Sequence, residues 1–72
     1  MSGKSVISPM PAKVLKVNVN VGDVVKRGTV LFITEAMKME NRIMSPMDGT
    51  VAEICVTVDQ SVNAGEKLAV IS

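Results

Sequence analysis

Apolar and polar residues alternate along two stretches of this 72-residue chain, residues 15–21 and 52–58. Strict alternation is the period of a β-strand that buries one face. Each stretch is followed by residues typical of turns and then by a continuous apolar run, at 30–33 in the first case and 68–71 in the second. Several short strands separated by regular turns predict an all-β barrel or sandwich.

The two alternating stretches belong to an internal repeat. Ser8-Pro9-Met10 returns as Ser45-Pro46-Met47, and many further positions match at the same spacing without a gap. The matching pairs are Val14 and Val51, Val17 and Ile54, Val19 and Val56, Val21 and Val58, Val25 and Val62, Gly28 and Gly65, Leu31 and Leu68, and Ile33 and Val70. We therefore expect two half-repeats, about 8–34 and 45–71, in a quasi-twofold arrangement, with the valines in the core.

The segment between the half-repeats, residues 35–41, does not follow the strand pattern. Its alanine, methionine, lysine and glutamate residues favour a helix, whereas neighbouring strands require a hairpin. A tight turn centred on Met37 and Lys38 would need positive φ at both, which costs on the order of 1 kcal/mol for each non-glycine residue. Such a conflict between local preference and fold is expected at a functional site, and it presents Lys38 to solvent.

Composition limits the chemistry that the chain can perform alone. It has no histidine, no Gly-rich phosphate loop and no nucleophile beside a plausible base, so we do not expect an enzyme. The formal net charge of +1 argues against nucleic acid as a partner. A single cysteine cannot form an internal disulfide, and no convincing metal-ligand set is present. Cys55, on the polar phase of its stretch, is predicted to be a partly exposed, inert thiol.

The sequence also gives expectations about location and domain organisation. No apolar run is long enough to cross a bilayer, and direct membrane contact is not expected. A free thiol without the apolar stretch of a signal peptide predicts a cytoplasmic protein. The length predicts one small domain at 6–72 after an N-terminal tail or linker at 1–5, monomeric when isolated.

The central motif resembles the attachment sequence of biotinyl domains in the biotin/lipoyl attachment family, where Ala-Met-Lys-Met surrounds the modified lysine. Its residues here are Glu35, Ala36, Met37, Lys38, Met39 and Glu40. The resemblance covers almost the whole chain, because the two Ser-Pro-Met turns and the Gly-Asp-Val-Val-Lys-Arg-Gly segment at 22–28 also match the family. Ala12 departs from it, since glycine is usual there and a turn with positive φ would be strained. The chain lacks room for an extra "thumb" loop, and so resembles the carriers of acyl-CoA and oxo-acid carboxylases, decarboxylases and transcarboxylase.

The resemblance implies a flattened barrel of two four-stranded antiparallel sheets. Both termini would lie at one end, and Lys38 would lie on the attachment hairpin, residues 35–41, at the other. A biotin–protein ligase would join biotin to Lys38 through an amide. The biotin would then carry a carboxyl group between a biotin carboxylase or decarboxylase site and a carboxyltransferase site, and these partners would recognise the residues that flank Lys38.

Two alternatives stay open at this point. A lipoyl carrier domain has a similar fold and also modifies a hairpin lysine, but its turn usually reads Asp-Lys-Ala, where this chain has Met37-Lys38-Met39. An unmodified barrel that serves as a structural adaptor would need no lysine at the tip. Turn packing is an equal alternative to recognition for the two methionines, and solvated surface is an equal alternative for Glu35 and Glu40. The acceptor substrate and the parent complex also stay open.

Overall fold

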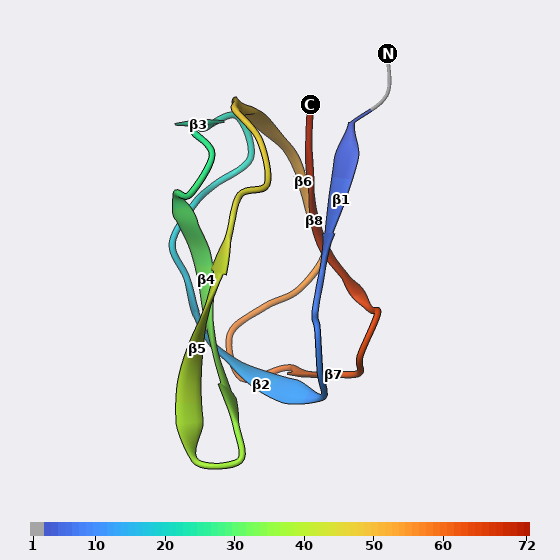
Figure 1. Cartoon of the computed structure of the whole chain (residues 1–72). Coiled ribbons are helices and arrows are strands. Elements are labelled where there is room, and N and C mark those ends of the chain that lie inside the picture. The colour runs from blue at the N-terminus through green and yellow to red at the C-terminus, as the bar shows by residue number, and fades with distance from the viewer. Residues whose placement is uncertain (1–2) are drawn as a thin grey trace.

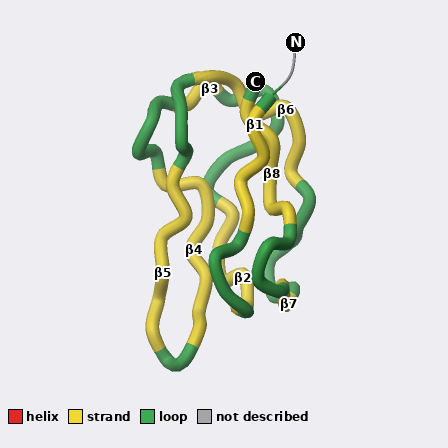
Figure 2. The backbone as a smooth tube through the Cα atoms, turned by 45° about the vertical axis from the view of Figure 1, so that its right-hand side comes forward, coloured by secondary structure: helices red, strands yellow, loops and turns green. Residues whose placement is uncertain are grey.

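The computed structural model describes residues 3–72, which form eight β-strands in two four-stranded antiparallel sheets (Figure 1). The strands are β1 (Lys4–Ile7), β2 (Ala12–Val17), β3 (Val24–Val25), β4 (Val30–Ala36), β5 (Met39–Met44), β6 (Gly49–Ile54), β7 (Ser61–Val62) and β8 (Lys67–Ile71). Strands and loops account for all of this part of the chain (Figure 2), in which no helix could span a membrane. The predicted all-β class and the two four-stranded sheets are confirmed.

The strand order shows the quasi-twofold relation between the halves. One sheet has the order β1-β8-β6-β3 and the other has the order β5-β4-β2-β7. The repeat spacing places β1 on β5, β2 on β6, β3 on β7 and β4 on β8, which converts the first order into the second. Each sheet therefore contains two strands from each half of the chain.

An apolar core fills the space between the sheets. Its buried members are Val6, Val14, Val19, Val25, Leu31, Phe32, Ile43, Val51, Val56, Val62, Leu68, Ala69 and Ile71. The prediction that the valines form the core holds for most of them, but Val21, Val24 and Val58 are exposed. Val24 alternates with the buried Val25 of the same strand, so its side chain points away from the core. Val21 and Val58 lie in loops, two residues beyond the buried Val19 and Val56.

The strands β2 and β6 end before the alternating stretches 15–21 and 52–58 do. Beyond them, Val19 and Val56 lie outside any strand and are nevertheless buried in the core. The apolar alternation therefore reports burial as far as Val19 and Val56, because a side chain can be buried without ladder hydrogen bonds to its backbone.

The N-terminal boundary also differs from the prediction. β1 begins inside the range 1–5, because Lys4 and Ser5 pair with Ile71 and Val70 of β8. Their polar side chains gave no strand signal, but an edge strand needs only its backbone groups to join the ladder. Residues 1–2 of the predicted tail lie outside the described part of the chain.

The strain expected at Ala12 is absent, because Ala12 is not among the residues with positive φ. It is the first residue of β2 and pairs with Val62. Its repeat counterpart, Gly49, does not have positive φ either. A Cβ atom on Gly49 would instead collide with the backbone oxygen of Ser72 and lie 2.9 Å from the Ile71 side chain. Glycine is required there by a close backbone approach and not by turn geometry.

Two buried serines fix the Ser-Pro-Met turns. The Ser8 hydroxyl donates to the carbonyl of Met10 at 2.6 Å, and the Ser45 hydroxyl donates to the carbonyl of Met47 at 2.6 Å. We expect Ser8→Ala and Ser45→Ala each to lower the free energy of unfolding by about 1 kcal/mol, since each leaves a part-buried carbonyl without this donor. Urea denaturation measures both values. Unequal losses would contradict the equivalence of the two turns.

Candidate functional site

The β4–β5 hairpin carries the candidate site. The ladder between the two strands continues to the pair Ala36 and Met39, so Met37 and Lys38 form a two-residue turn. The turn lies at the end of the molecule opposite to the start of β1 and the end of β8 (Figure 1), and Figure 2 shows the same arrangement from another side. The hairpin therefore holds Lys38 far from the start of β1 and the end of β8, as the family resemblance implied.

Both turn residues have the left-handed conformation predicted from the sequence. Met37 has φ 53° and Lys38 has φ 64°. Positive φ at both positions defines the turn whose twist matches that of a right-twisted hairpin, although asparagine and glycine are the residues that usually adopt it. The pairing of β4 with β5 thus overrides the helical preference of the segment and holds two non-glycine residues in a strained conformation.

The side chains around the turn are unusually apolar for a solvent-exposed position. Lys38 is exposed, Met37 is 90% exposed and Met39 is 65% exposed. Such exposure leaves the methionines little protein surface to pack against, which argues against turn packing as their role. Ala36 is 9% exposed and is directed into the fold. The tip therefore presents one primary amine between two flexible thioether side chains.

The two glutamates of the motif lie on the hairpin directly opposite each other. Glu35 pairs with Glu40 across β4 and β5, and Glu35 also has Lys13 of β2 as its partner on the other side. Both carboxylates are exposed. The hydrogen bonds and ion pairs found among residues 3–72 include none to the Lys38 amine, so an enzyme that acylates this amine must supply the base.

Replacement of Met37 by asparagine tests the strain in the turn. Asparagine tolerates positive φ better than methionine, so Met37→Asn is expected to raise the free energy of unfolding by about 0.5–1 kcal/mol. Thermal or urea denaturation measures the change. Met39→Asn is the matched control. Met39 is also an exposed methionine of the hairpin, but it lies in β5 and does not have positive φ. Equal effects of both substitutions would show that the turn is not strained.

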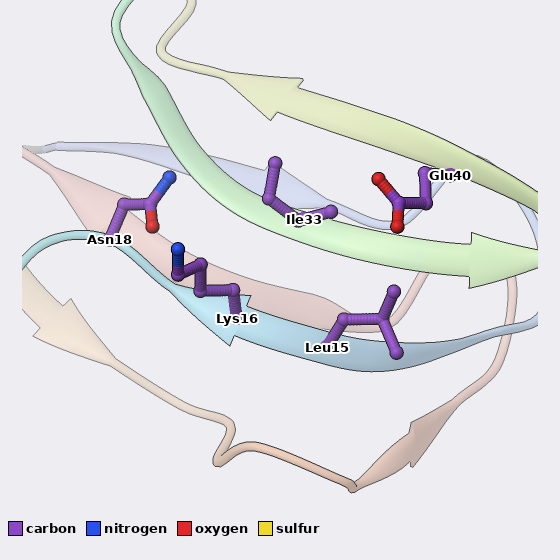
Figure 3. Close-up of a pocket in the computed structure, with 5 residues that line it drawn as sticks. All are labelled: Leu15, Lys16, Asn18, Ile33 and Glu40. Carbon is purple, nitrogen blue, oxygen red and sulfur yellow. The ribbon is translucent and has the colours of Figure 1, made fainter.

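The structure brings a second group of side chains close to the motif. Leu15, Lys16, Asn18 and Ile33 line a hollow together with Glu40 (Figure 3). Apart from Glu40, none of them was predicted to be a site residue. Leu15 and Lys16 lie in β2, Asn18 follows β2 and Ile33 lies in β4. Only the pairing of β2 with β4, and of β4 with β5, places them together.

Relatives of known name resemble the chain in sequence. A family described as "Biotin-requiring enzyme" matches residues 4–71. The biotin carboxyl carrier protein of Streptococcus mutans is 54% identical over 65 residues, which are 90% of this chain and 50% of that protein. The alpha subunit of mitochondrial methylcrotonoyl-CoA carboxylase from Dictyostelium discoideum is 51% identical over 67 residues, 93% of this chain and 10% of the subunit. The chain thus spans half or less of these relatives.

Solved structures contain the same fold. The crystal structure of urea carboxylase from Kluyveromyces lactis matches with a TM-score of 0.93 and 30% identity, over 100% of this chain and 6% of that one. The match of the family over residues 4–71 agrees with the ordered strands, which run from Lys4 to Ile71. On this evidence the chain belongs to the biotin/lipoyl attachment family, the family of biotin-requiring enzymes.

Proposed function

We propose that this chain is a biotin carboxyl carrier domain in which Lys38 holds biotin through an amide bond. The observation that carries the proposal is the exposed Lys38 amine at the tip of a strained turn, between two exposed methionines and opposite the start of β1 and the end of β8. Biotin has one carboxyl group, and a free primary amine is the partner with which that group forms a stable, neutral amide. The residues present therefore fit the cofactor.

The domain contributes position and not catalysis. Bound biotin supplies a ring nitrogen that accepts and releases a carboxyl group, a chemistry that side chains do not provide. Four lysine methylenes, the amide and the five-carbon acid chain of biotin together reach on the order of 15 Å from the backbone. The rigid hairpin defines where this arm begins, and tethering gives the arm a high effective concentration at a docked partner.

The proposed partners follow from this role. A biotin–protein ligase attaches the cofactor, and biotin carboxylase or decarboxylase and carboxyltransferase components use it. Relatives named as a biotin carboxyl carrier protein and as a methylcrotonoyl-CoA carboxylase subunit support biotin over lipoate. We assign recognition by these enzymes to the residues around the lysine: Glu35, Ala36, Met37, Met39 and Glu40. Exposure of Met37 and Met39 supports that role, since exposed apolar groups are common at binding surfaces.

Intact-mass spectrometry tests the cofactor. The chain is co-expressed with a biotin–protein ligase in one culture and with a lipoate ligase in another, and the modified peptide is then sequenced. We expect a gain of one biotin, confined to Lys38, and no lipoyl gain. Lipoyl addition alone would favour the lipoyl carrier, and no addition by either ligase would favour an unmodified adaptor, which streptavidin would then fail to bind after denaturation.

A further inference from the structure

A groove lies on the outer face of the sheet that carries the attachment hairpin. Leu15, Lys16, Asn18, Ile33 and Glu40 line it, and its volume is about 320 Å³. In Figure 3, Lys16 and Asn18 lie toward one end and Leu15 and Glu40 toward the other, with Ile33 between them. Since Glu40 follows Lys38 by two residues, the groove begins close to the attachment turn and runs away from it.

The strand register explains why apolar side chains lie on this outer face. Lys16 pairs with Ile33, and a β-bulge between Val14 and Lys16 changes the register. Val14 is fully buried in the core, whereas Leu15 and Ile33 are only partly buried. A bulge opposes two residues to one and so redirects a side chain. Here it leaves Leu15 beside Ile33 as an apolar floor with charged groups on both sides.

We propose that this groove is a resting site for the biotin group attached to Lys38. The inference rests on the proposed function and adds a binding site to it. Strand residues advance about 3.3 Å each. Glu40 therefore lies roughly 7 Å along the strands from Lys38, and Ile33, which pairs with Arg42, lies roughly 13 Å from it. An arm with a reach of about 15 Å, folded back along the outer face, brings its bicyclic head between these two residues.

The lining matches the chemistry of that head. Its ureido group has two N–H donors and one carbonyl acceptor, and its sulfur ring and acid chain are apolar. Glu40 offers acceptors for the N–H groups, the Lys16 ammonium is a donor for the carbonyl, and the Asn18 amide can serve either way. Leu15 and Ile33 cover the apolar atoms. The volume is near the lower end of the range for small-ligand sites, about 300–1,000 Å³.

A tether makes even a weak site effective. The local concentration of a group on a short flexible linker is on the order of mM, so a groove with a millimolar dissociation constant would hold the head for about half of the time. Such a site shields the cofactor between reactions and still releases it to a partner enzyme.

Nuclear magnetic resonance of the biotinylated chain tests the site. We expect nuclear Overhauser effects between the biotin ring protons and the methyl groups of Leu15 and Ile33, and shifts of these methyl signals relative to the unmodified chain. Ile33→Gln should abolish the effects. Val70→Gln, at the equivalent position of the other half, should retain them and serves as the matched control. Should Ile33→Gln disturb the fold, Lys16→Gln, with Glu53→Gln as its repeat-related control, removes the donor at an exposed position.

The outcomes separate the inference from the proposed function. Biotin in the intact mass without effects to Leu15 or Ile33, or with shifts confined to residues 36–40, would overturn the resting site and leave the carrier function intact. Equal loss of the effects in the Ile33 and Val70 variants would also overturn the site. A chain that gains no biotin would overturn both proposals.

Discussion

Lys38→Arg is expected to abolish biotin attachment completely and to leave the barrel folded. The guanidinium stays protonated and delocalised, so it does not attack an activated acyl group as an amine does. The side chain is exposed in the turn, and its removal costs no core packing. Intact mass after co-expression with the ligase measures attachment, and a proton–nitrogen correlation spectrum reports the fold.

Lys67→Arg is the control for this result, since Lys67 is also exposed but lies in β8, outside the motif. It should be biotinylated like the parent chain. A Lys38→Arg protein that still gained biotin would move the attachment site to another amine and would remove the basis of the proposed function.

Phe32→Ala is expected to cause the largest loss of stability, about 3–5 kcal/mol. Phe32 is 0% exposed and is the only aromatic residue of the chain. Its truncation removes buried apolar area and leaves a cavity that a two-sheet core cannot fully close. Small domains have about 5–15 kcal/mol in total, so much of the fold's stability would be lost. Urea denaturation gives the value.

The repeat supplies a control for this substitution. Ala69 occupies the position equivalent to Phe32, is also 0% exposed and belongs to the same core cluster. Ala69→Phe alone should destabilise by overpacking, whereas the exchange Phe32→Ala with Ala69→Phe conserves the total core volume. We expect the double variant to lose less than the sum of the single losses. Strict additivity would indicate that the two positions do not share one core.

The sequence was most informative where burial and symmetry act together. Alternation and the repeat predicted the strands, and the need to join neighbouring strands by a hairpin predicted a turn at Met37 and Lys38 with positive φ, which the structure has. Strand ends were less predictable, because Val19 and Val56 are buried without being in a strand. The tail was predicted too long, since Lys4 joins an edge strand through its backbone alone.

The candidate site was predictable only in part. The residues themselves indicated an exposed lysine in a strained hairpin, and the family resemblance added biotin as the cofactor attached to it. The groove beside it could not be predicted, because its lining depends on a bulge in β2 and on which strands become neighbours. Ile33 and Asn18 come together only when β2 pairs with β4. The residues within either strand do not predict which strand will be its neighbour.

The exchange of strands between the sheets has a mechanical consequence. Each sheet draws two strands from either half, so the halves are interlocked and cannot part unless both ladders break. The turn at Met37 and Lys38 is the covalent connection between the two halves, at the point where the pairing of β4 with β5 ends. Cleavage of a peptide bond in this turn would leave two fragments held together by the paired strands of both sheets. The lysine therefore lies at the connection between the halves, where a change in the turn itself breaks no strand pair of either sheet.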